Sequence, residues 1–243
     1  MSHQTSQAST CSAEFIRPPG QLFQLLAIGF SHPGSEFRQR LQNGDYTRAL
    51  GESTRGLPVA LPELPAPLAA EKDYEAQYIH LFHTGRSGKP MVSLNAGDHD
   101  TVLAEQGRPE FLLQYADWYR HFGLRVSETE SNELPDHLLC QLELMAWLAY
   151  LEHSSNDEPG LQRGYRLAQR DFLQGHLLPL LESLAQGLRD VRSGEPIAAF
   201  YQALADLALE CSAMLLGQLN TLASESAESG DKAADIAAVN LWG

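Results

Sequence analysis

Two short segments of the chain bring together side chains that could bind or act on another molecule. The first, Glu133-Leu134-Pro135-Asp136-His137, places an acid and an imidazole at the expected start of a helix, among unpaired backbone N–H groups. The second is an apolar helical face followed by a loop, and it contains Tyr78, Leu81, Phe82, Pro90 and Ser93. Asp136 and His137 could exchange protons as an acid–base pair. They could equally complement the helix dipole and bond to a neighbouring loop.

An enzymatic role finds no further support in the residues. The sequence has no Gly-rich phosphate loop, no Gly-x-Ser-x-Gly elbow and no His-Glu-x-x-His pair. His80 and His83 lie three residues apart on one helix, but no third ligand accompanies them, so we favour solvent exposure over metal binding. Asp98-His99-Asp100 lies in an expected loop, where turn capping or plain solvation explains it better than a ligand cluster. We therefore predict no catalytic residue, no metal and no cofactor.

The charge balance limits the classes of partner. Seventeen Lys+Arg against 31 Asp+Glu give a net charge of −14, which disfavours binding to nucleic-acid phosphates. An acidic surface suits a cationic partner such as an arginine-bearing peptide, although solubility alone would also explain it.

Several features indicate a reduced, cytoplasmic protein. Cys11, Cys140 and Cys211 are far apart, which favours free thiols over disulfides or a zinc site. The N-terminus has no basic region followed by an apolar stretch, so no secretory signal is expected. The sequence also has no pair of adjacent arginines and no uninterrupted apolar run of about 20 residues that would span a membrane.

The elements that must position the two segments are all predicted to be helices. Apolar residues recur at helical spacing in the stretches 21–30, 36–50, 74–82, 111–122, 135–151, 161–188 and 196–219. We expect Pro135 in the first turn of its helix, Gly123 to end the preceding one, and Pro179 to kink or divide the stretch 161–188. The proline-rich residues 57–67 and the polar residues 89–101 are expected loops.

No convincing alternation of apolar and polar residues indicates a strand. The predicted fold is therefore all-α, a single helical bundle of seven or more helices. With 243 residues the chain is long enough to bury one core without disulfides. We expect a flexible N-terminus over 1–14, one helical domain over 15–222 and a flexible tail over 223–243.

The order of the motifs carries a resemblance to a known family. Tyr-x-x-Leu-Phe at 78–82, Pro-x-x-Ser at 90–93 and Glu-x-Pro-Asp-His-Leu at 133–138 resemble the TorD/DmsD/NarJ-type molybdoenzyme chaperones. The match continues in Phe122-Gly123-Leu124, Glu143-Leu144-Met145, the stretch 168–173 and His176-Leu177. These flanking elements are most similar to the branch that serves type II DMSO-reductase-family enzymes.

The resemblance implies a non-catalytic, cytoplasmic protein. Such a chaperone would bind the twin-arginine leader and the apo form of the catalytic subunit of a molybdopterin oxidoreductase, and would assist cofactor insertion before export. A general helical adaptor with no link to molybdoenzymes is the alternative.

The resemblance also implies which residues would contact the client. An apolar wall for the leader would come from Tyr78, Leu81 and Phe82, and the adjoining loop would be shaped by Pro90 and Ser93. The remaining contacts would come from Glu133, Pro135, Asp136 and His137, with Glu133 or Asp136 facing the arginines of the leader.

Overall fold

The structure is a computed structural model that describes residues 20–62, 64, 74–85, 87–99, 102, 107–124, 133–195 and 197–228. Its α-helices are α1 (Gly20–Phe30), α2 (Ser35–Gln42), α3 (Asp45–Ser53), α4 (Tyr74–Ile79), α6 (Arg108–His121), α7 (Leu138–Ser154), α8 (Pro159–Phe172), α9 (Leu178–Val191) and α10 (Ala198–Glu228). Two π-helical turns, η1 (His80–Thr84) and η3 (Leu173–Leu177), and one 3-10 turn, η2 (Ala96–Asp98), complete the elements. Within the described ranges there is no strand, and the prediction of an all-helical bundle is confirmed.

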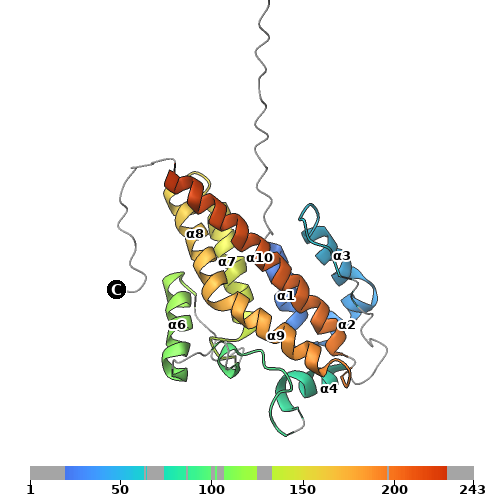
Figure 1. Cartoon of the computed structure of the whole chain (residues 1–243). Coiled ribbons are helices and arrows are strands. Elements are labelled where there is room, and N and C mark those ends of the chain that lie inside the picture. The colour runs from blue at the N-terminus through green and yellow to red at the C-terminus, as the bar shows by residue number, and fades with distance from the viewer. Residues whose placement is uncertain are drawn as a thin grey trace, which may run out of the picture.

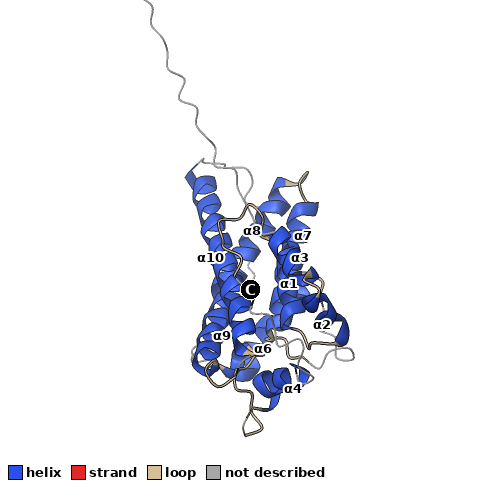
Figure 2. Cartoon of the chain, turned by 90° about the vertical axis from the view of Figure 1, so that its right-hand side faces the viewer, coloured by secondary structure: helices blue, strands red, loops and turns tan. Residues whose placement is uncertain are grey.

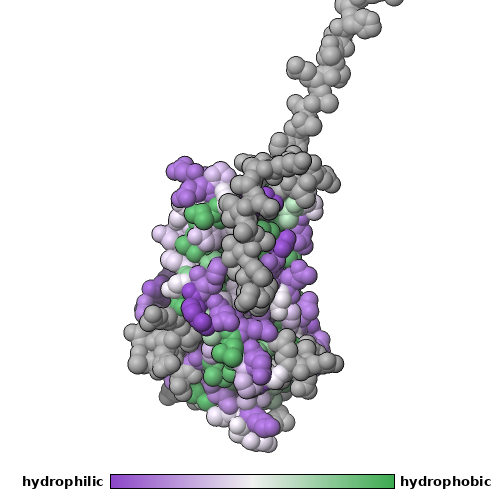
Figure 3. All heavy atoms as spheres, turned by 90° about the vertical axis from the view of Figure 1, so that its left-hand side faces the viewer, coloured by the Kyte–Doolittle hydropathy of each residue, from purple (hydrophilic) through white to green (hydrophobic). Residues whose placement is uncertain are grey.

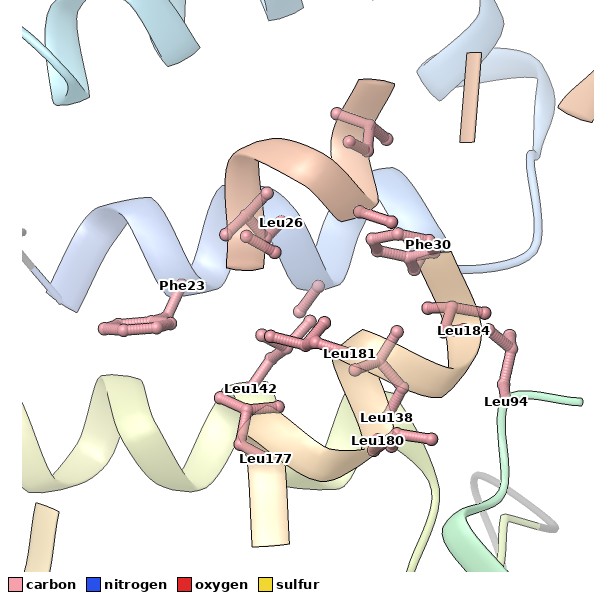
Figure 4. Close-up of a cluster of buried hydrophobic side chains, with 14 of the residues drawn as sticks. Phe23, Leu26, Phe30, Leu94, Leu138, Leu142, Leu177, Leu180, Leu181 and Leu184 are labelled. Carbon is pink, nitrogen blue, oxygen red and sulfur yellow. The ribbon is translucent and has the colours of Figure 1, made fainter. Parts of the chain in front are cut away.

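The core forms where helices from both halves of the chain pack together. Helix α7 lies between α1 and α8, and α9 packs along α10 (Figures 1 and 2). Figure 4 shows how side chains from α1, α7, η3 and α9 meet in this core. They include Phe23, Leu26, Phe30, Leu138, Leu142, Leu177, Leu180, Leu181 and Leu184. Each buried leucine of this kind contributes about 1.5–3 kcal/mol to stability through the hydrophobic effect.

The predicted helix over 36–50 is wrong as a single element. The structure divides it into α2 and α3 at Asn43 and Gly44. Gly44 has a φ of 77°, a left-handed conformation that glycine adopts without steric cost. The side chain of Asn43 accepts a hydrogen bond from the backbone N–H of Asp45, which stabilises the break.

Two other predicted helix boundaries are confirmed. Gly123 ends α6 with a φ of 73°, and the N–H groups of Gly123 and Leu124 donate to the carbonyls of Arg120 and Tyr119. This is the Schellman arrangement of a helix C-terminus. Pro179 lies just after the π-helical turn η3. This turn separates α8 from α9, so the stretch 161–188 is divided near Pro179 as predicted. A proline lacks the N–H that continues an α-helix, so the chain widens locally to a π turn.

Helix α10 differs from the expectations in its length. It continues to Glu228, past the boundary at residue 222, while residues 1–14 and 229–243 lie outside the described part of the chain. By length and composition, Ala198–Ser224 could cross a membrane. More than half of its apolar 18-residue window is buried inside the protein, however, and α10 packs on α8, α9 and α1, so its position in the core accounts for its apolar composition.

Candidate functional site

The two segments singled out in the sequence lie side by side. An isolated antiparallel bridge pairs Asn95 with His137, and the N–H of Leu138 donates to the carbonyl of Leu94 at 2.8 Å. On its other side the same loop is tied to η1, because the N–H of Met91 donates to the carbonyl of Leu81 at 2.9 Å. The loop over 91–96 therefore joins the π-helical turn to the Pro-Asp-His segment.

The three apolar site residues form the base of this region. Tyr78, Leu81 and Phe82 are only 2%, 0% and 4% exposed. The Tyr78 hydroxyl donates to the carbonyl of Phe30 at 2.8 Å. The Phe82 ring packs edge-on against the Tyr201 ring, with the two ring centroids 4.8 Å apart. The resemblance implied that they form an apolar wall for the leader; in this structure the three side chains belong to the core and lie beneath the site. Their contact with another chain stays a prediction.

Asp136 is placed differently from the prediction. Helix α7 begins at Leu138, so Pro135 and Asp136 lie in the turn before the helix and not in its first turn. The Asp136 carboxylate is fully buried, and its Oδ2 accepts a hydrogen bond from the N–H of Gly97 at 2.7 Å. Its Oδ1 has no hydrogen-bond partner among the described residues. Burial raises the pKa of this carboxyl group, because the charged form is poorly solvated.

Gly97 is needed for this contact. A Cβ atom at Gly97 would lie 3.0 Å from Oδ2 of Asp136 and 3.2 Å from Nη1 of Arg108. Both distances are shorter than ordinary van der Waals contacts, so a larger residue would push the loop away from the acid.

His137 caps the helix that follows it. Its Nδ1 accepts a hydrogen bond from the N–H of Leu139 at 3.2 Å, and its Nε2 lies 3.2 Å from the carboxylate of Glu133. Burial, with a smaller effect of His83, lowers the pKa of His137 to about 4. The imidazole is therefore neutral at neutral pH, with its Nε2 facing the Glu133 carboxylate. The backbone of His137 pairs with Asn95 of the neighbouring loop, which agrees with the prediction that His137 bonds to that loop. The ring contacts Leu139 and Glu133, which belong to its own segment.

A polar network that the sequence did not predict fixes residues 91–98, which we call the Ser93 loop. Ser93 Oγ donates to the Asp98 carboxylate at 2.6 Å, and Arg108 donates to the same carboxylate at 2.6 Å and to the carbonyl of Gly97 at 2.8 Å. Burial acts to raise the pKa of Asp98, but the hydrogen bonds from Ser93 and Arg108 outweigh it and lower the pKa. The Asp98 carboxylate thus bonds to the side chains of Ser93, Asn95 and Arg108 instead of capping the turn through a backbone N–H, and Asp100 lies outside the described residues. The sequence did not identify Arg108 as part of this network, because Arg108 begins α6 and is distant in sequence from both motifs.

Pro90 and Pro135 shape backbone at the edges of the site. Pro90 is half-buried and directly precedes Met91, whose N–H bonds to η1. The carbonyl of Pro135 accepts a hydrogen bond from the Tyr119 hydroxyl at 2.6 Å, which attaches the segment to α6.

His80 and His83, which were considered as metal ligands, have different neighbours. His80 faces Glu195 at 3.6 Å, and the His83 ring lies against the Tyr78 ring.

The accessible rim of the site is acidic and partly apolar. The Glu133 side chain is 31% exposed, and Leu134 beside it is 40% exposed. Glu143 is also exposed, and Leu139 and Cys140 are half-buried. Figure 3 views the side of the molecule that includes α6, and it shows apolar residues interspersed among mostly hydrophilic ones. This geometry can bind another molecule.

Comparisons with known proteins agree with the motifs. The family model described as nitrate reductase delta subunit matches residues 45–186, more than half of the chain. The chain therefore belongs to this family, which confirms the NarJ-type resemblance.

The relatives within the family are more specific. The chain is 37% identical over 233 residues to the dimethyl sulfide dehydrogenase assembly chaperone protein of Rhodovulum sulfidophilum, covering 91% of each chain. It is 29% identical over 202 residues to the perchlorate reductase assembly chaperone protein of Dechloromonas aromatica, covering 77% of this chain and 84% of the relative. It is also 34% identical over 122 residues to the selenate reductase assembly chaperone protein of Thauera selenatis, covering 50% and 61%. No solved structure matches the chain.

Proposed function

We propose that this protein is an assembly chaperone for a molybdopterin oxidoreductase. It binds the catalytic subunit in its apo form, together with its twin-arginine leader, in the cytoplasm, and it is not itself an enzyme. The observation that carries the proposal is the similarity to the dimethyl sulfide dehydrogenase assembly chaperone protein, which extends over 91% of both chains. Two further relatives are likewise assembly chaperones of reductases.

The site geometry is consistent with binding rather than catalysis. Asp136 and His137 do not form an acid–base pair, because the Asp136 carboxylate accepts from Gly97 while the His137 ring accepts from Leu139 and faces Glu133. Both residues are buried and serve to position the loop and the start of α7. The groups at the surface include the Glu133 carboxylate and the Leu134 side chain, which suit a segment that combines a cation with apolar residues.

A pull-down tests the proposal. The tagged full-length chain, purified from the cytoplasm of its native cell, is expected to retain a molybdoenzyme catalytic subunit that still carries its leader. Mass spectrometry identifies the partner and shows whether the leader is present. Deleting the leader from the client gene is expected to lower the amount recovered. Recovery of an unrelated stable partner, and no oxidoreductase, would favour the general helical adaptor instead.

A further inference from the structure

Helix α7 has one face that the bundle leaves open. Its other faces pack on α1 and α8, but Leu139, Cys140, Glu143, Trp147 and Tyr150 fall on a single outward face at helical spacing. Surface helices normally present polar residues to water, so an outward face of this composition indicates a binding surface. We call these five residues, with the adjoining Leu134, the α7 strip.

The α7 strip is partly solvent-accessible along its length. Leu134 is 40% exposed at one end and Tyr150 is 58% exposed at the other, and Leu139, Cys140 and Trp147 between them are half-buried. The Trp147 indole donates to the carbonyl of Phe122 at 3.0 Å and stacks on Tyr150 at 5.3 Å. These contacts hold the aromatic end of the strip in a fixed orientation beside the C-terminal end of α6.

Acidic groups without a cationic partner border the apolar part. Glu143 makes no ion pair with any described residue. Glu133 lies 3.2 Å from Nε2 of His137, whose ring is neutral at neutral pH, so Glu133 too has no cationic partner among the described residues. Burial, followed by the charges of Glu143 and Glu133, raises the pKa of the Cys140 thiol to about 12, so both carboxylates act on this part of the strip. The sulfur of Cys140 lies 3.8 Å from the carbonyl of Leu134, which places the thiol beside the Glu133 segment.

A buried group reinforces the negative charge. Asp136 Oδ1 is buried and has no hydrogen-bond partner among the described residues, and the charge of Asp136 also acts on Cys140. In contrast, most described arginines already contact a carboxylate, including Arg108, Arg120, Arg166 and Arg189. Carboxylates that pair with no described cation and border an apolar surface are complementary to a peptide that carries arginine next to an apolar stretch.

We infer that the α7 strip is the docking surface for such a peptide, with Glu143 and Glu133 receiving its guanidinium groups and the apolar residues receiving its apolar part. This inference rests on the proposed function. It specifies the surface that binds the peptide, the direction in which the peptide runs along α7, and Glu143 as a residue that contacts it. The arginines bind near Cys140, and the apolar stretch runs towards Trp147 and Tyr150.

Peptide binding to matched variants tests the inference. The probe is a fluorescein-labelled synthetic peptide with two adjacent arginines before an apolar stretch, and its partner has glutamines in place of the arginines. We expect Glu143→Gln to weaken binding of the arginine peptide about five- to tenfold, as loss of a charge-assisted hydrogen bond at a partly exposed site would do. The glutamine peptide should bind both proteins equally. Glu182→Gln, the same change on the exposed side of α9, is the control and should change neither affinity.

A second readout locates the bound peptide. In the C11S variant of the full chain, Cys140 is the accessible thiol, because Cys211 is fully buried. Bound arginine peptide is expected to slow alkylation of Cys140 by N-ethylmaleimide. If the arginine peptide binds wild type and E143Q equally and leaves the alkylation rate of Cys140 unchanged, the α7 strip is not the docking surface. The proposed function then still stands if the pull-down recovers an oxidoreductase. A pull-down without an oxidoreductase overturns the proposed function itself.

Discussion

The Asp136 carboxylate accepts a hydrogen bond from the backbone N–H of Gly97 at 2.7 Å, across 39 residues of sequence. This contact holds the Ser93 loop against the segment that leads into α7. It also explains why an acid stands at a fully buried position, because the loop offers a backbone donor that would otherwise have no acceptor. Asp136 is thus a positioning residue of the site.

Replacing Asp136 by alanine is expected to lower the free energy of unfolding by about 1–3 kcal/mol, because the N–H of Gly97 loses its acceptor in a buried place. Asp136→Asn keeps an oxygen acceptor and removes a charge that burial disfavours, so its loss should be clearly smaller. Urea unfolding at neutral pH measures both. Equal losses would show that the charge, and not the hydrogen bond, stabilises the loop.

Stability is expected to fall as the solution is acidified from pH 6.5 towards pH 4. Burial lowers the pKa of both His137 and His176 to about 4, below the ordinary histidine value of 6.5. Between these values the unfolded chain binds more protons than the folded one, so the stability present above pH 6.5 is lost as pH decreases. Each histidine contributes a slope of about 1.4 kcal/mol per pH unit within this window.

Single substitutions separate these two contributions. Urea unfolding across the pH window should show a shallower slope for His137→Gln and for His176→Gln than for wild type. His153→Gln, which changes an exposed histidine near the end of α7, is the control and should keep the wild-type slope. Wild-type slopes in both test variants would contradict the assignment to these two rings.

Two glycines on helices should respond in opposite directions to alanine. A Cβ at Gly29 of α1 would lie 2.8 Å from Cδ1 of Leu204 and would also meet the Tyr46 hydroxyl, so Gly29→Ala should destabilise by about 1–3 kcal/mol. Gly164 of α8 has open space around its Cβ position, so Gly164→Ala should stabilise by about 0.5–1 kcal/mol. Thermal melting measures the two shifts, and a lower melting temperature for Gly164→Ala would contradict the second.

A buried ion pair joins α7 to α8. Glu152 is fully buried, Arg166 donates to it at 2.6 Å and Gln169 donates to its other oxygen at 2.8 Å. Arg166→Ala removes the guanidinium from a buried carboxylate, which should cost about 2–4 kcal/mol. Arg170→Ala breaks a more exposed pair with Asp171 and should cost less than about 1 kcal/mol. Similar unfolding midpoints for the two variants would contradict this ranking.

The sequence predicted the helical elements because their apolar spacing is local. The same local reading failed at Asn43 and Gly44, where the apolar pattern continues across a break that depends on backbone conformation. It also could not orient Asp136, because its partner Gly97 and the neighbouring Arg108 belong to other segments. The family motifs identified which segments meet. They did not show that Tyr78, Leu81 and Phe82 are buried, since apolar side chains suit a core and a binding groove equally.

The bridge between Asn95 and His137 has a consequence for synthesis on the ribosome. A nascent chain that has emerged only as far as α6 contains the Ser93 loop but not the strand-like partner that orients it. The site is therefore completed only after the start of α7 has left the exit tunnel. A surface built in this way is therefore complete only after more than half of the chain has been synthesised.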